Sequence, residues 1–187
     1  MRVTMRKLLL PALLLVTATG CGREPGFQPD EVLDWSIDNF TVNFDACTDN
    51  PSWRQLFVDP IQLSEARRAV KVSSDALTAD MLDCAGLATS ACKPVEPRVI
   101  FTVDGLHLRY AKTTLSDVEN STCKISFGQD IVIEDRGNAM TETFVYSYAL
   151  EGEAGACAEL DAQLAARGTN GIGIDGCTVT VVSEGSL

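Results

Sequence analysis

The chain has 187 residues, of which 15 are basic and 26 acidic, and its formal net charge is −11. An acidic chain of this kind repels phosphate backbones, so nucleic-acid binding is excluded as a function class. It also holds seven cysteines but one histidine, which limits the metal and nucleophilic chemistry it can carry.

Residues 1–20 have the pattern of a secretory signal peptide. Arg2, Arg6 and Lys7 precede the apolar run "LLLPALLLV", which is too short to span a bilayer. This segment is expected to act as an export signal rather than as a fold element. Its removal leaves 12 basic against 26 acidic residues and a net charge of −14, which strengthens the exclusion of nucleic acids as partners.

Cys21 follows small residues in "TATGC", and this stretch resembles the lipobox of bacterial lipoproteins, which signal peptidase II cuts before the cysteine. The resemblance covers residues 1–21 only. It implies a thioether to diacylglycerol and an acylated α-amine on Cys21. Two or three acyl chains, at about 0.8 kcal/mol per buried methylene, then hold the protein at a membrane. There are two alternatives. Ordinary signal peptidase could cleave near Ala18 and give a soluble protein, or the segment could stay as an uncleaved anchor.

Gly22 follows the cysteine. In Gram-negative lipoproteins Asp at this position usually marks retention in the inner membrane, so the resemblance implies the outer membrane, on its periplasmic or cell-surface side. Residues 21–30 lack a periodic apolar pattern and predict a short lipidated tether of about 3.3 Å per residue. Residues 31–187 fit a single globular domain.

Alternating apolar residues predict the strands of this domain. A first strand covers residues 35–44, with a phase change near Asp38-Asn39 that indicates a bulge or turn. Residues 56–74 stay unassigned, because "LSEARRAV" has a helical pattern and "AVKVSS" an extended one. A short helix is expected over residues 78–87.

The clearest local signal is "RVIFTVDGLHLRYA", in which Asp104-Gly105 is typical of a two-residue hairpin turn. In that register Phe101 faces Leu108, and His107 lies across from Thr102 on the wetter face. The buried face then holds six apolar residues: Val99, Phe101, Val103, Leu106, Leu108 and Tyr110.

Further strands are predicted at residues 123–127, 130–134, 141–150 and 177–183, with a hairpin loop over 134–140 and a helix over 157–168 that Gly168 caps. The pattern predicts an α+β, mainly antiparallel β domain with one to three helices, built as a sandwich or a curved sheet and stabilised by disulfides. A lipocalin-like barrel also ends with a helix and a strand, and this similarity is an analogy only.

With Cys21 assigned to the lipid, an even number of cysteines remains for disulfides in an exported chain. We expect the pairs Cys84–Cys92, Cys157–Cys177 and Cys47–Cys123. Zinc is disfavoured because the chain has no Cys-x-x-Cys pair and a single histidine.

No motif in the chain assigns a catalytic residue, a cofactor or a metal ligand. "GIGIDG", residues 171–176, matches a nucleotide-binding pattern, but it follows a helix and precedes a strand and is interpreted as a connection. His107 is the one histidine that could serve a nucleophilic site, and no "G-x-S-x-G" elbow accompanies it. Asp45, Asp49 and Asn50 in "DACTDN" could bind calcium but lack EF-hand spacing.

These observations predict a non-enzymatic lipoprotein that binds another envelope protein or a surface ligand, or has a structural role. The alternative is a carboxylate-dependent envelope hydrolase. A deep cleft with two close acidic side chains of raised pKa would favour the enzyme. A flat or convex surface with an exposed apolar patch would favour the binding module.

Overall fold

The computed structural model describes residues 23–44, 67–84, 92–167, 171 and 173–187. Within these residues the chain forms nine strands and a helix of 14 residues. No helix in this described part is long and apolar enough to cross a membrane. In chain order the elements are β1 (Val32–Phe44), β2 (Arg67–Val72), β3 (Thr78–Asp83), β4 (Lys93–Pro94), β5 (Ile100–Asp104), β6 (His107–Asp117), β7 (Lys124–Asp135), β8 (Ala139–Glu151), α2 (Ala154–Arg167) and β9 (Thr178–Ser186).

Eight of these strands close into an antiparallel barrel, and the short β4 pairs with β3 outside the closed ring. Strands that follow each other along the chain lie side by side around the barrel. The first strand, β1, pairs with β2 on one edge and with the last strand, β9, on the other. The prediction of mainly antiparallel β structure with disulfides is confirmed. The expected sandwich or open curved sheet is wrong, because the β1–β9 pairing removes the free edges that either would have.

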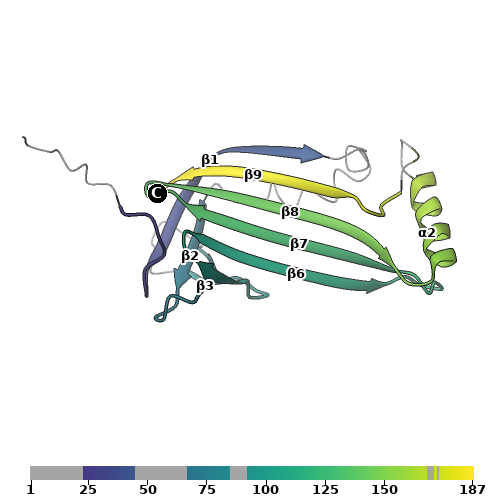
Figure 1. Cartoon of the computed structure of the whole chain (residues 1–187), viewed down its shortest axis with the longest axis horizontal. Helices are drawn as coiled ribbons and strands as arrows, with labels where there is room; N and C mark the ends of the chain where they lie inside the picture. Colours follow the sequence, from purple (N-terminus) through teal and green to yellow (C-terminus); the bar gives the residue numbers. More distant parts are fainter. Residues whose placement is uncertain (1–22, 45–66, 85–91, 168–170, 172) are drawn as a thin grey trace, which may run out of the picture.

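The strands differ in length, which gives the barrel two unlike ends. β2 and β3 have six residues each, whereas β7 and β8 have 12 and 13. The long strands therefore continue past the short wall as a curved sheet, and α2 lies at their far end (Figure 1). We call the end formed by the turns at residues 73–77, 105–106 and 136–138 the closed end. The opposite end, where β2 begins and β3 ends, is the open end.

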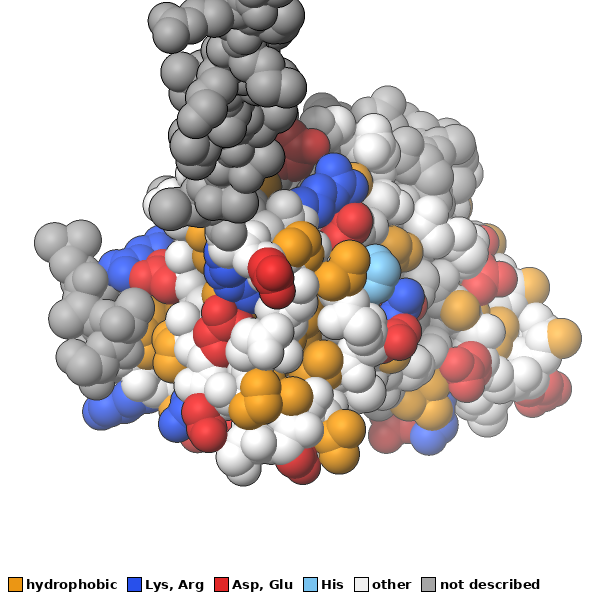
Figure 2. All heavy atoms as spheres, turned by 60° about the vertical axis from the view of Figure 1, so that its left-hand side comes forward, with side chains coloured by type: hydrophobic (Ala, Val, Ile, Leu, Met, Phe, Trp, Pro, Cys, Tyr) orange, Lys and Arg blue, Asp and Glu red, His pale blue; other side chains and the backbone are white. Residues whose placement is uncertain are grey.

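Residues 23–30 pack across the closed end. Phe27 is 6% exposed and belongs to the core. Arg23 Nη1 donates to the fully buried Asp135 at 2.5 Å, and Arg23 Nε donates to Glu31 at 2.9 Å. Asp135 also accepts the backbone N–H of Gly26 at 2.8 Å. Residues 23–30, which belong to the stretch predicted as a tether, thus contact the barrel through Phe27 and Arg23. Figure 2 turns this end toward the viewer.

The β5–β6 hairpin confirms the predicted inward face but not its register. Val103 pairs with Leu108 and Asp104 with His107, so the turn residues are Gly105 and Leu106 rather than Asp104 and Gly105. The shift moves each partner by two residues, which leaves every side chain on its predicted side of the sheet. The exception is Leu106, which is 43% exposed in the turn.

Some of the other local predictions are confirmed and others are wrong. The bulge in β1 lies between Ile37 and Asn39, as the phase change indicated, and α2 covers most of the predicted helix. The helix expected over residues 78–87 is wrong where the structure describes it. Residues 78–83 form β3, because Ala79 and Met81 alternate toward the core between β2 and β5. The strands expected at 123–127 and 130–134 are one continuous β7.

Two disulfides lie within the described residues. Cys84–Cys92 is confirmed. Cys123 pairs with Cys157, so the expected pairs Cys157–Cys177 and Cys47–Cys123 are wrong. The reason is that Cys157, near the start of α2, lies beside the residues that precede β7. Cys177 is also disulfide-bonded, whereas Cys21 and Cys47 fall outside the described residues.

Candidate functional site

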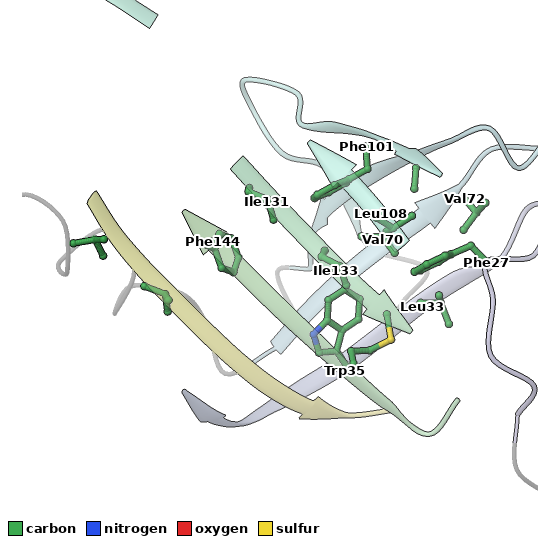
Figure 3. Close-up of a cluster of buried hydrophobic side chains, with 14 residues drawn as sticks. Phe27, Leu33, Trp35, Val70, Val72, Phe101, Leu108, Ile131, Ile133 and Phe144 are labelled. Carbon is green, nitrogen blue, oxygen red and sulfur yellow. The ribbon is translucent and has the colours of Figure 1, made fainter. Parts of the chain in front are cut away.

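A cluster of buried apolar side chains fills much of the barrel interior. Inward-pointing side chains from several strands pack together in this cluster (Figure 3). Trp35 and Phe101 are the largest of them, at 1% and 0% exposure. These side chains form one packed hydrophobic core.

A polar layer lies in the interior, and Glu142 of β8 is its centre. The carboxylate is 1% exposed. Trp35 of β1 donates its indole Nε1–H to Glu142 Oε1 at 2.9 Å, and Ser183 of β9 donates its hydroxyl to Glu142 Oε2 at 2.7 Å. Both oxygens of this buried acid are thus hydrogen-bonded, as buried polar groups require.

Arg68 of β2 approaches the same carboxylate from the short wall. Its Nε lies 3.7 Å from Glu142 Oε1, and its side chain is 14% exposed. Burial raises the pKa of Glu142, and this effect outweighs the opposing influence of Arg68, Ser183 and Trp35. The acid consequently holds its proton more tightly than an exposed glutamate does.

Aromatic side chains continue the interior face of β7 and β8 beyond this layer. Phe127 contacts Tyr146 and Tyr148, with ring centroids 5.9 and 4.9 Å apart. Burial raises the pKa of both tyrosines, and the amide of Gln129 hydrogen-bonds Tyr146. These phenols remain protonated at neutral pH and serve as hydrogen-bonding groups on an otherwise apolar wall.

A hollow of about 340 Å³ opens beside Arg68 at the open end. Positive, negative and apolar side chains all contribute to it, from the start of β2, the end of β3 and the chain after β4. The lining residues are Arg67, Arg68, Met81, Leu82, Asp83, Val95 and Glu96. Arg68 lines the hollow and its Nε also lies 3.7 Å from Glu142 Oε1, so this side chain connects the hollow to the buried acid. We take this hollow and the polar layer as the candidate site.

A second hollow, of about 370 Å³, lies between α2 and the residues before β7. Its lining includes Glu119, Asn120, Glu159 and Gln163 and is mostly polar. No buried ionisable group faces it among the described lining residues, so we assign it no chemistry.

The residues that the sequence singled out do not gather at this site. His107 lies half-buried at the start of β6, paired with Asp104 and Glu134 near the closed end. The described part of "GIGIDG" connects α2 to β9, where Asp161 Oδ1 accepts the backbone N–H of Ile174 at 2.7 Å. The candidate calcium ligands lie outside the described residues. Within the described ranges, no three His, Cys, Asp or Glu side chains gather as metal ligands would.

Sequence reasoning missed Glu142 and Trp35, although a signal for Glu142 was present. Phe144, Tyr146 and Tyr148 alternate inward, and two residues earlier the same alternation places Glu142 on the same face. An acid on a buried face needs partners, and those partners come from β1, β2 and β9, which the sequence does not bring together.

No protein-family model, curated protein or solved structure matches the chain.

Proposed function

We propose that the protein is a lipid-anchored, non-enzymatic binding module of the cell envelope, attached to the outer membrane through Cys21, with its ligand site at the open end of the barrel. The observation that carries the binding role is the hollow beside Arg68, which lies at the open end of the closed barrel. Barrel mouths are common places for ligand sites. The pattern of residues 1–21 supports the anchor.

The surroundings of Glu142 support binding over hydrolysis. A carboxylate-dependent hydrolase needs a second carboxyl group roughly 5–10 Å from the first. Among the described residues, the groups in contact with Glu142 are a guanidinium, a hydroxyl and an indole. Both carboxylate oxygens accept hydrogen bonds from side chains of the barrel, so the acid links β1, β8 and β9. The envelope hydrolase is therefore the weaker candidate.

Membrane fractionation of the wild-type protein and Cys21→Ala tests the anchor. The wild type should fractionate with membranes and incorporate a labelled fatty acid, and Cys21→Ala should lose both properties. Identical behaviour of the two proteins would refute the anchor.

Site-specific photocrosslinking in intact envelopes tests the binding site. A crosslinking residue at Glu96, which lines the hollow, should give a discrete adduct, and one at Glu119, in the other hollow, should not. Adducts at Glu119 alone, or turnover of glycan or peptide that Glu142→Gln abolishes, would contradict the proposal.

A further inference from the structure

Three of the seven large hydrophobic side chains that are exposed among the described residues lie together at the closed end. Leu77 is 63% exposed, Leu106 43% and Leu187 44%. They come from three separate segments: the β2–β3 turn, the β5–β6 turn and the chain end after β9. Hydrophobic side chains are visible among charged ones on this face (Figure 2). Three leucines that are exposed at one end, on two turns and on the chain after β9, suggest a surface that something covers.

The N-terminal segment enters the barrel among these leucines. Leu106 lies beside Gly26. Asn138 accepts the backbone N–H of Leu187 at 3.3 Å through its carbonyl, and that of Arg23 at 3.4 Å through its side chain. The bonds from Arg23 to Asp135 and Glu31 fix this point of entry relative to the barrel.

Cys21 precedes Arg23 by two residues. Because an extended chain spans at most about 3.6 Å per residue, the two Cα atoms cannot be more than about 7 Å apart. Acyl chains on Cys21 would therefore bring the closed end itself to the lipid headgroups, with no long linker to let the barrel turn over.

We propose that the closed end is a membrane-docking face: Leu77, Leu106 and Leu187 rest in the interface of the bilayer that holds the acyl chains of Cys21, and the open end and α2 point away from it. This inference rests on the lipid anchor of the proposed function. Two of the acidic side chains of this end are paired with arginines, which limits their repulsion from headgroups: Asp104 lies 3.1 Å from Arg109, and Glu134 lies 2.9 Å from Arg136.

Fluorescence quenching on vesicles tests the orientation. The lipidated protein would carry a fluorophore at Leu106→Cys or, as a matched control, at Leu115→Cys. Leu115 is equally exposed, at 46%, but lies near the other end of β6. Phosphatidylcholine vesicles with a nitroxide-labelled lipid should quench the fluorophore at position 106 and leave that at position 115 unchanged. Near-ultraviolet circular dichroism checks that both variants fold.

Each outcome is decisive. Vesicle-bound protein in which position 106 is unquenched, or in which position 115 is quenched equally or more, would overturn the docking face while leaving the anchor intact. Lipid-treated protein that does not bind vesicles at all would overturn the anchor, and the docking face with it.

Discussion

Trp35 of β1 donates its indole Nε1–H to Glu142 of β8 across β9, the strand that lies between them. Ser183, the residue of β9 directly opposite Glu142, donates to the other carboxylate oxygen. Three strands are thereby tied together at the seam where the first strand meets the last. The polar layer thus has a structural role in closing the barrel as well as a connection, through Arg68, to the hollow at the open end.

Loss of the Glu142 carboxylate should destabilise the barrel. Glu142→Ala leaves the buried indole N–H and the Ser183 hydroxyl without their acceptor, at about 1–3 kcal/mol for each stranded group. Denaturant unfolding measures this cost. The control is Glu151→Gln, an exposed position on the same strand, which should change the unfolding free energy by less than about 0.5 kcal/mol. Equal stability of Glu142→Ala and the wild type would contradict the role of the layer.

The pH dependence of stability should reflect the raised pKa of Glu142. Because burial raises its pKa, the folded state binds this proton more tightly than the unfolded state, whose value is near 4.5. The stabilisation that this tighter proton binding gives the folded state is therefore full below about pH 4.5, and it is lost as the pH rises through the raised pKa of the folded state. Glu142→Gln stays neutral at every pH, so its unfolding free energy should improve relative to the wild type as pH rises. A difference independent of pH would refute the shift.

Gly185 should tolerate no side chain. A Cβ atom at this position of β9 would lie 2.4 Å from the Ser36 carbonyl oxygen and 2.8 Å from Trp35 Cδ1. Gly185→Ala should therefore displace the indole and cost about 1–3 kcal/mol. Gly155→Ala in α2, where a Cβ meets nothing within 4 Å, is the matched control and should be neutral or stabilising. Similar losses at both sites would argue against a close approach at Trp35.

The contact of Arg23 with Asp135 can be isolated by a double-mutant cycle. Asp135 is fully buried, so Arg23→Ala leaves a buried carboxylate without its cation and should cost about 1–3 kcal/mol. In the Asp135→Asn background the same change should cost clearly less. Equal costs in the two backgrounds would show that Arg23 acts through other contacts.

The two described disulfides should differ in their effect. Cys123 and Cys157 are 34 residues apart and Cys84 and Cys92 are eight apart. Replacing the longer-range pair by serines should cost about 2–4 kcal/mol, and about 1 kcal/mol more than replacing the shorter-range pair. Non-reducing peptide mapping should recover both linkages, and a Cys157–Cys177 peptide would contradict the assignment.

The sequence predicted which face of a strand is buried better than it predicted which strands pair with each other. Alternation placed Phe101 and Leu108 in the interior, because which side of a strand is buried is a local property. It could not show that β1 pairs with β9, since Ser36 and Ser186 are 150 residues apart and nothing local records that contact. The same limit hid the candidate site, whose groups come from five strands, β1, β2, β3, β8 and β9, and from the chain after β4.

The pairing of β1 with β9 also constrains the order in which the strands can assemble during folding. A chain that emerges N-terminus first, from a ribosome or through a membrane, presents β1 long before its second neighbour exists. Barrel closure must wait until the last strand is available, and such long-range contacts make folding slow. Until then β1 and β8 each expose an unpaired edge, which can recruit strands from other chains. Loss of the last nine-residue strand should therefore produce aggregation rather than a smaller soluble domain.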